Sequence, residues 1–525
     1  MKKAFYFLAA AALSAAAFTA CTGDEYAATP EKIPLTAEEE GEPTYATFTF
    51  RLDDEGAATR APMVTDEYEP APPLTSFSSI RLLVFEDRAN DRGLCLADTL
   101  ITAFGTEPYP PEGQSATVVM TSGQKRVLVI ANTAGKTKIE NLLARAVAYE
   151  GITYADFLAS RNLYDIGIPA VAAGVPVTGL DLSELVPTDA PASSMVYSSK
   201  DSVTLQPSIT YGTSRNGIGP DDNHFEIMLR RPVAKVTVAT TQTSPIQVDS
   251  EQGWLQNLKY RIQNVNRSLY LFQQTAGGSV VTPNNQLYPA YVNDDSPFIP
   301  YFYRGYDYTD LLPASSATRP VYITENVQPI SSYRGATYAE VEAVYVPNLW
   351  YVIDDFSFNS GSRFTGITRP DQFIAGSDFY RLDPYSYWNT YSGDSINTSS
   401  IFTDSLKAYK AAYCLKYATE SGFDINNLDG DLKESVWKYT GGKCYYRIDF
   451  RESFSSRMSI LRNHHYILNI SSFSELGDNI PIFIIRVDDG TGTEDTSPTY
   501  ITASVTVEPW INDYYTIPAT PYTPF

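Results

Sequence analysis

A regular alternation of apolar and polar residues predicts a β-strand early in the chain. In the stretch TYATFTFRL (44–52), apolar residues recur at every second position, which is the spacing of one face of a half-buried strand. The residues of this face are Ala46, Phe48, Phe50 and Leu52. The following segment DDEGAATR (53–60) is polar and contains glycine, so we interpret it as an exposed linker.

Similar patterns predict strands along most of the chain and only a few helices. Apolar residues recur at helical spacing in 136–150, and helices are also expected at 153–161 and 405–421. The expected strands are 79–87, 115–122, 125–133, 224–241, 259–265, 319–326, 339–347, 443–451, 464–471, 481–487 and 500–510. Many strands with turn-rich gaps favour a mainly β fold of sandwiches over β-α-β units.

The N-terminal residues have the pattern of a lipoprotein signal. A cationic MKK segment precedes the apolar stretch AFYFLAAAALSAAAF, and the sequence FTAC ends at Cys21. This pattern predicts a secretory signal peptide over 1–20 and lipid acylation of Cys21, which would anchor the exported chain to a membrane. A plain signal with an incidental cysteine is the alternative. No later segment approaches the ~20 apolar residues that a membrane helix requires.

Charge and composition narrow the class of partner. The formal net charge is −22, which disfavours nucleic acid because like charges would be brought together. The 38 tyrosines and 25 phenylalanines suit a β-rich, extracytoplasmic protein. Residues 22–60 hold ten acidic and three basic residues, a net charge of −7, and the part ahead of the first strand, 22–43, is acidic and interrupted by prolines, so we expect a flexible tether there.

Residues that usually carry catalysis or bind metals are few. Of three histidines, His464 and His465 are adjacent in an expected strand and therefore point to opposite faces. The segment 424–434 departs from a calcium loop because Leu428 occupies a ligand position, and 486–498 is primarily an expected linker. We therefore expect no enzymatic activity, no cofactor and no metal site.

Three features leave alternatives open. Carboxylates are abundant, so a glycosidase pair is not excluded by counting. The aromatic segment 379–391 suits either stacking on sugars or capping of a sandwich. Cys95, Cys414 and Cys444 are expected to be buried free thiols, with one disulfide as the alternative.

Taken in order, several landmarks resemble the fimbrillin family of type V pilins from Bacteroidota, in particular shaft subunits of the minor-fimbrium kind. They are the lipobox at Cys21, the strand and linker FTFRLDDEGAATR, KRVLVIANTAGKTKIENLL, RPVAKVTVATT, KCYYRIDFRESFSSRMSILRNHHYILNISSFSELG and YITASVTVEPWINDYY. The TGDE sequence after Cys21 also resembles the acidic signal that directs such lipoproteins to the cell surface.

The resemblance implies two transthyretin-like β-sandwich domains, which we place at 61–245 and 246–525. It also implies a lipoprotein precursor at the surface of the outer membrane, cut after Arg60 by an Arg-specific protease. Ala61 would then begin the mature subunit, and 21–60 would leave with the anchor and the first strand. The groove so emptied would accept a strand from another copy or a related pilin subunit, and the resulting pilus would support adhesion to a glycan or protein surface.

The C-terminal strand is the candidate donor. Ile501, Ala503, Val505 and Val507 share one of its faces, and prolines interrupt the tail beyond it. Which C-terminal segment is donated stays open. Four Asp-Ser/Thr-aliphatic tripeptides resemble O-glycosylation sites of Bacteroidota, and their use also stays open. An alternative from a different class of function is a surface lipoprotein that binds glycans, keeps its lipid anchor and stays monomeric.

Overall fold

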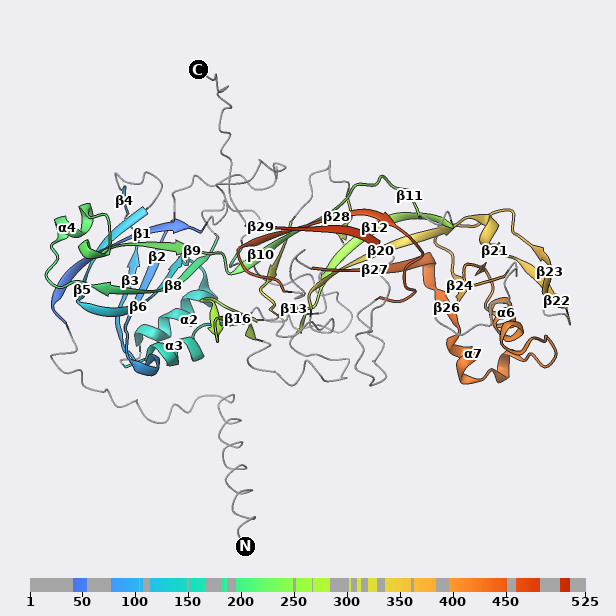
Figure 1. Ribbon diagram of the computed structural model, residues 1–525, viewed down its shortest axis with the longest axis horizontal. Helices are drawn as coiled ribbons and strands as arrows, with labels where there is room; N and C mark the ends of the chain where they lie inside the picture. Colours follow the sequence, from blue (N-terminus) through green and yellow to red (C-terminus); the bar gives the residue numbers. More distant parts are fainter. Residues whose placement is uncertain are drawn as a thin grey trace, which may run out of the picture.

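The protein is an elongated molecule built mainly from β-strands in three successive units (Figure 1). Each unit has its own hydrophobic core. The computed structural model describes residues 41–53, 77–102, 104–106, 114–148, 151–165, 182, 184–186, 195–248, 252–266, 268–283, 302–303, 309–312, 320–327, 336–359, 363–383, 396–450, 459–481 and 501–509. The predicted fold class, mainly β with sandwiches and a few short helices, is confirmed.

Two four-stranded sheets enclose the core of the first unit. Their strand orders are β4-β5-β1-β9 and β3-β2-β6-β8. The strands are β1 (Pro43–Leu52), β2 (Ile80–Glu86), β3 (Cys95–Ile101), β4 (Gly105–Thr106), β5 (Gln114–Thr121), β6 (Gly123–Ala131), β8 (Tyr197–Leu205) and β9 (His224–Leu229). Because β5 and β6 belong to different sheets, the short turn between them carries the chain across the sandwich.

Short helices cover parts of this first sandwich (Figure 1). The helices expected at 136–150 and 153–161 are confirmed with slightly shorter bounds, as α2 (Thr137–Ala148) and α3 (Tyr154–Ser160). Thr153 begins α3 because its hydroxyl accepts a hydrogen bond from the backbone N–H of Asp156. The other helical segments are α4 (Tyr211–Asn216), η3 (Ala89–Asp91) and η5 (Pro220–Asp222).

The second unit is also a two-sheet sandwich. Its sheets have the orders β11-β12-β20-β27, with β18 beside β12, and β19-β10-β28-β29. The strands are β10 (Val233–Thr240), β11 (Ile246–Gln247), β12 (Gly253–Gln263), β18 (Thr309–Asp310), β19 (Val321–Thr324), β20 (Tyr338–Pro347), β27 (Lys443–Asp449), β28 (His464–Phe473) and β29 (Ile501–Pro509). Residues of both sheets, such as Val341 and Leu468, meet in one core.

A third unit lies between β20 and β27 in the sequence, where we expected a single C-terminal sandwich. Its core joins a small sheet of order β21-β25-β24-β26 to helix α6, whose buried alanines let the helix pack closely. The elements are β21 (Val352–Ile353), β22 (Asp355–Asn359), β23 (Arg363–Thr368), β24 (Phe379–Leu382), β25 (Ile401–Phe402), β26 (Val436–Tyr439), α6 (Ser405–Tyr417), α7 (Gly430–Glu434), η7 (Leu349–Tyr351), η8 (Ile425–Asn427) and η9 (Thr440–Gly442).

The chain passes from the first core to the second within a segment expected to be one strand, 224–241. The structure divides it into β9 and β10, which belong to different units. Pro232 stands at the break and has no N–H to donate. Val233 still packs in the first core and Ala234 already packs in the second. The chain therefore passes from the first core to the second before residues 245/246, where we expected the domain boundary. That boundary stays a prediction.

Short strands between β10 and β20 connect the units. Among them, β14 pairs with β7 of the first unit in antiparallel register, with Leu269 opposite Tyr164. β7 is Leu163–Asp165, and the short strands between β10 and β20 are β13 (Val265–Asn266), β14 (Ser268–Tyr270), β15 (Gln274–Ala276), β16 (Ser279–Val281) and β17 (Phe302–Tyr303). A segment from the second half of the sequence thus completes the first core, which contains Leu269, Leu271 and Phe272.

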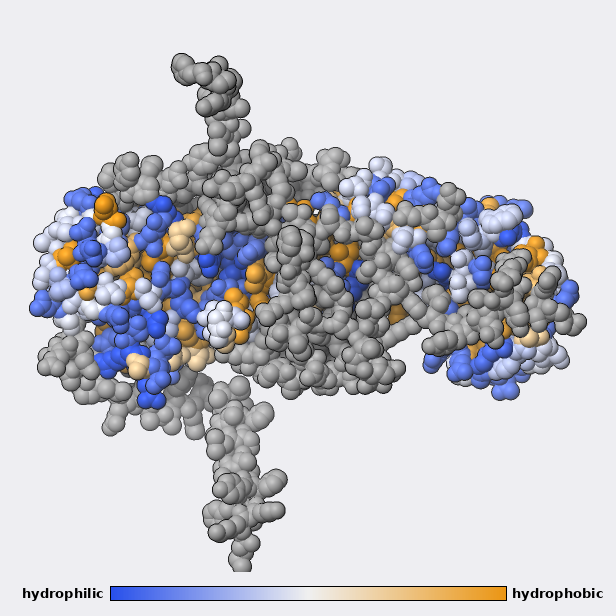
Figure 2. All heavy atoms as spheres, viewed as in Figure 1, coloured by the Kyte–Doolittle hydropathy of each residue, from blue (hydrophilic) through white to orange (hydrophobic). Residues whose placement is uncertain are grey.

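The face drawn in Figure 2 mixes hydrophilic with scattered hydrophobic residues over the described surface. Among the exposed large apolar side chains, Val119 and Ile218 belong to the first unit and Trp350 to the third, and scattered residues of this kind are ordinary on a protein surface. Among the described helices, none has both the length and the apolar character needed to cross a membrane.

Candidate functional site

Strand β1 lies inside its sheet, not at an edge. Residues Pro43 to Phe50 pair with β5 in antiparallel register, and Thr47 to Leu52 pair with β9 in parallel register. Because β5 and β9 do not pair with each other, removal of β1 would leave both of them with unpaired N–H and C=O groups.

The apolar face of β1 fills the first core. Ala46, Phe48 and Phe50 are at most 1% exposed, and the ring centroids of Phe48 and Phe225 lie 5.8 Å apart. Leu52 is half-buried and packs against the same core. These are the four residues expected on the apolar face. Their role in a removable strand stays a prediction.

The opposite face of β1 is also buried, which the alternation alone did not predict. The Thr47 hydroxyl lies 2.9 Å from the hydroxyls of both Thr117 and Ser214. The Thr49 hydroxyl lies 2.8 Å from Nε2 of His224. Since Ser214 belongs to α4, this short helix covers the polar face of the strand. The groove that holds β1 therefore has an apolar wall and a polar wall.

Asn223 holds the beginning of β1. It is fully buried and adopts a left-handed backbone with φ of 54°. Its side-chain amide donates to the Thr44 hydroxyl at 2.9 Å and to the Tyr45 carbonyl at 3.1 Å. The same amide group donates to the Gln206 carbonyl, and its oxygen accepts from the Gln206 N–H. One side chain thus connects β1 to the loop after β8.

Asp53 connects the end of β1 to the second unit. Its backbone N–H donates to the Leu229 carbonyl at 2.9 Å, and its buried carboxylate pairs with Arg230. Its carbonyl accepts a hydrogen bond of 3.0 Å from the side chain of Asn463, which lies just before β28. The end of β1 therefore contacts the turn that leads into the sheet containing β29.

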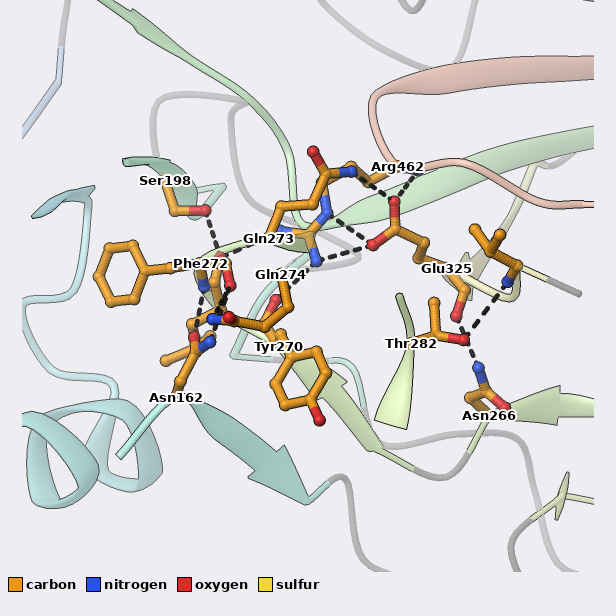
Figure 3. Close-up of polar contacts among 12 residues, drawn as sticks. Asn162, Ser198, Asn266, Tyr270, Phe272, Gln273, Gln274, Thr282, Glu325 and Arg462 are labelled. Carbon is orange, nitrogen blue, oxygen red and sulfur yellow. Dashed lines mark hydrogen bonds and ion pairs between the residues drawn. The ribbon is translucent and has the colours of Figure 1, made fainter. Parts of the chain in front are cut away.

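A buried ion pair lies at the same junction (Figure 3). The side chains of Arg462 and Glu325 are each 3% exposed, with 3.0 Å between Nη2 and a carboxylate oxygen. Arg462 also donates to the carbonyls of Tyr270 and Leu271 at 2.7 and 3.1 Å. Since Leu271 packs in the first core, this one guanidinium holds elements of both units.

Asn162 fastens the same connecting segment from the side of the first unit (Figure 3). Its side chain donates to the Phe272 carbonyl at 2.8 Å and accepts from the Phe272 N–H at 2.6 Å. The hydroxyl of Ser198 donates to the Leu271 carbonyl. The backbone groups of Leu271 and Phe272 therefore have hydrogen-bond partners on both sides: Asn162 and Ser198 from the first unit, and Arg462 from the second.

Strand β29 lies at the end of its sheet and pairs with β28 in antiparallel register from Ile501 to Pro509. In the part of the chain that the structure describes, β28 is its one strand neighbour. Ile501, Ala503, Val505 and Val507 occupy alternate positions along it. Their role as a donated face stays a prediction. The other predicted sites, Cys21, Arg60 and Ala61, lie outside the described residues.

Histidines and cysteines have structural surroundings. Burial, reinforced by the positive charge of Lys235, lowers the pKa of His465 to about 3, and its Nε2 lies 2.8 Å from the Thr237 hydroxyl. Cys95, Cys414 and Cys444 are free cysteines, the last two buried, and burial raises the pKa of each thiol to about 12. A thiol with such a pKa is a poor nucleophile.

The acidic segment 424–434 caps helices. Carboxylates of Asp424 and Asp429 accept hydrogen bonds from the N–H groups of Asn426 and Leu432. Asp429 also accepts from Lys416. No group of three or more His, Cys, Asp or Glu residues suited to a metal ion occurs among the described residues. Of the aromatic segment 379–391, Phe379 is buried against Tyr439, and 384–391 lie outside the described residues.

Residues 437–516 match the family model described as major fimbrial subunit protein type IV, fimbrillin, C-terminal. This match covers the strands β27, β28 and β29 of the second unit. A comparison with curated protein sequences found no match.

Solved structures give further similarities. The chain is 12% identical to a fimbrilin from Porphyromonas gingivalis W83, over 89% of this chain and 98% of that one, with a TM-score of 0.42. The tip fimbrial protein Mfa3 from Porphyromonas gingivalis, truncated at its C-terminus, is 12% identical over 89% of this chain and 100% of that one, with a TM-score of 0.37.

Proposed function

We propose that this chain, whose residues 437–516 match the fimbrillin C-terminal model, is a structural, non-enzymatic pilin of that family and the precursor of a pilus subunit that polymerises by strand exchange. The match of the C-terminal region to fimbrial subunits supports a fimbrial protein at the cell surface. The route to the surface, the cleavage and the exchange are the proposal. The observation that carries it is the position of β1, buried on both faces and paired on both edges, directly before a polar linker.

Export and anchoring precede assembly in this proposal. The signal peptide is removed and Cys21 is acylated, which holds the precursor on the outer membrane by its lipid. The acidic residues from 22 onward form a tether between the lipid and β1. During this stage β1 fills its own groove, so the subunit stays monomeric.

Cleavage after Arg60 by an Arg-specific protease then releases β1 with the anchor. Arg60 ends the polar segment 53–60 that follows β1 in the sequence, and the next strand, β2, begins at Ile80. A long connection between the strand and the rest of the subunit supports removal of β1 without breakage of the sandwich. Ala61 becomes the first residue of the mature subunit.

Loss of β1 makes the groove unstable in water. Burial of each phenylalanine contributes about 1.5–3 kcal/mol, and Phe48 and Phe50 would both leave the core. The edges of β5 and β9 would also lose their backbone partners. A strand from the C-terminal region of another copy, for which β29 is the candidate, satisfies both needs. Because donor and groove are different surfaces, the contact repeats from subunit to subunit into a filament, which supports adhesion to a host or bacterial surface.

The test is cleavage of the purified chain without its signal peptide by an Arg-specific protease. We expect a new N-terminus at Ala61, followed by ladders on gels and filaments in electron micrographs. The Arg60→Lys variant keeps the charge but removes the cleavage site, so it should stay intact and monomeric.

Two outcomes would contradict the proposal. A chain that is cut after Arg60 yet stays monomeric at high concentration would show that β1 removal does not drive assembly. Assembly of uncut Arg60→Lys protein would remove this bond from the mechanism. Saturable binding of a glycan by uncut monomer would instead support the anchored, glycan-binding alternative.

A further inference from the structure

We propose that the C-terminal strand of a second copy enters the β1 groove in a single register, with Ala503 in the place of Ala46. In this register Ser504 and Thr506 take the places of Thr47 and Thr49. The inference rests on the proposed function and adds the register and the groove residues that select it.

The two strands share an unusual side-chain order. Residues 46–50 of β1 read ATFTF, and residues 503–507 of β29 read ASVTV. At each position the class of residue is the same: alanine, hydroxyl, large apolar, threonine, large apolar. The match therefore covers the apolar face and the polar face together. The polar face is informative because buried hydroxyls require partners in specific places.

The polar wall of the groove supplies those partners. Ser214 is fully buried, and its hydroxyl donates to the Asn223 carbonyl at 3.2 Å. The Thr47 hydroxyl can then donate to Ser214 and accept from Thr117, which completes a chain of three hydroxyls. A strand without a hydroxyl here leaves Ser214 and Thr117 each short of one hydrogen bond. Ser504 supplies that hydroxyl in the proposed register.

Neighbouring registers fail for physical reasons. A shift by one residue places apolar side chains on the polar wall. A shift by two places one way brings Ile501 to the position of Ala46, which is fully buried, so the three extra carbon atoms would overpack the core. A shift by two the other way brings Glu508 to the position of Thr49 and Pro509 to that of Phe50. The alanine and the two hydroxyls thus select one alignment.

The same comparison explains why cleavage must come first. Val505 and Val507 are smaller than Phe48 and Phe50, so the incoming strand fills the apolar wall less completely than β1 does. It also brings no ring to stack on Phe225, as Phe48 does. An intact, covalently attached β1 therefore outcompetes the donor, and exchange follows only after β1 is released.

Cysteine pairs test the register directly. In β1, Phe48 lies opposite Ala116 and Phe50 lies opposite Gln114. The matched double variants, which leave the hydroxyls intact, are therefore Val505→Cys with Ala116→Cys, and Val507→Cys with Gln114→Cys. The mismatched control combines Val505→Cys with Gln114→Cys. Directly opposite residues lie within the ~4.4–6.8 Å between Cα atoms that a disulfide spans, and diagonal ones lie near or beyond its limit.

The experiment uses the full chain without its signal peptide, cut after Arg60, assembled and then oxidised. Denaturing gels without reductant should show covalent ladders for both matched pairs, at least about tenfold stronger than for the mismatched pair or the parent chain with its own cysteines. Equal ladders from the mismatched pair would overturn the register. Filaments without cross-links in either matched pair would overturn β29 as the donor. Failure of the parent chain to assemble would instead contradict the proposed function.

A second measurement tests the hydroxyl contact. Ser504→Ala should slow assembly about tenfold. A buried hydroxyl of the groove would lose its hydrogen-bond partner, and the free-energy cost of that loss corresponds to roughly a tenfold change in rate. The matched control is Thr502→Ala, since its counterpart Tyr45 contacts the Tyr211 ring and lies outside the hydroxyl chain. Thermal unfolding of the uncut variants shows whether either substitution destabilises β29 in its own sheet. Such an effect can then be distinguished from an effect on its binding in the groove of another subunit. Equal rates for both variants, with equal stability, would contradict a role for the hydroxyl.

Discussion

At the scale of single residues, the first sandwich depends on small polar side chains in buried places. Thr47 and Thr49 face the polar wall of the groove, and Asn223, directly before β9, holds the backbone of β1. Asparagine suits this place because it tolerates a left-handed backbone and offers both donors and an acceptor. No single apolar contact could replace this set of hydrogen bonds.

Asn223→Ala should lower the free energy of unfolding by about 2–3 kcal/mol, because several buried backbone and hydroxyl groups lose their partner. The matched control is Asn257→Ala. Asn257 has the same φ of 54° but an exposed side chain, so that variant should lose only the roughly 1 kcal/mol of the left-handed conformation. Urea unfolding monitored by circular dichroism measures both. Equal losses would mean that the hydrogen bonds of Asn223 contribute nothing.

At the scale of elements, β1 is a central strand that the proposal treats as temporary. Most central strands are permanent, because they hold two neighbours at once. Residues 53–79 separate β1 from β2 in the sequence, and they begin with the polar linker, which makes a temporary role physically feasible. The stability of precursor and mature subunit should therefore depend on different residues.

Phe48→Ala should destabilise the uncut precursor by about 3–5 kcal/mol, as expected for a large core residue. Once β1 has been removed, the same substitution should leave the stability of the filament unchanged. Phe225→Ala is the control, since Phe225 lies in β9 and remains in the groove. It should destabilise both forms. Thermal unfolding of uncut monomer and of cut filament makes the comparison. A Phe48→Ala filament weaker than the parent filament would contradict removal of β1.

At the scale of the whole molecule, the junction between the first two units is stiffened by buried charge. Arg462 and Glu325 pair inside it, and Arg462 also reaches carbonyls of the segment that completes the first core. In the proposed filament, load passes through this junction from one subunit to the next. A buried pair with every carbonyl satisfied resists bending better than an exposed one.

Glu325→Gln should lower the free energy of unfolding by about 3–5 kcal/mol, because Arg462 would keep a buried charge without its counter-charge. Differential scanning calorimetry should also resolve separate transitions for the first and second units. Glu342→Gln is the control. Its partner Lys443 is 47% exposed and both residues lie within the second unit, so the loss should be at most about 1 kcal/mol. If Glu325→Gln lowered the unfolding temperature but the two units still unfolded in a single transition, the ion pair would not link the units.

Local pattern was enough for much of the architecture. Alternation located β1, β2, β5, β20, β27 and β28 within a few residues, and helical spacing located α2, because these periods depend on near neighbours in the chain. It did not locate the break between β9 and β10 or the separate third core. Both depend on which distant strands pair, and local sequence carries little information about that pairing.

The sequence by itself determined the strand-rich fold class, the apolar face of β1 and the polar linker after it. Only the tertiary structure decided that β1 is central, that its polar face is also buried, and that Asp53 reaches the turn before β28. The physical reason is that burial of Thr47 and Thr49 requires α4 and β9, which lie more than a hundred residues away in the chain. Alternation reveals one face of a strand, and the folded chain decides what covers the other.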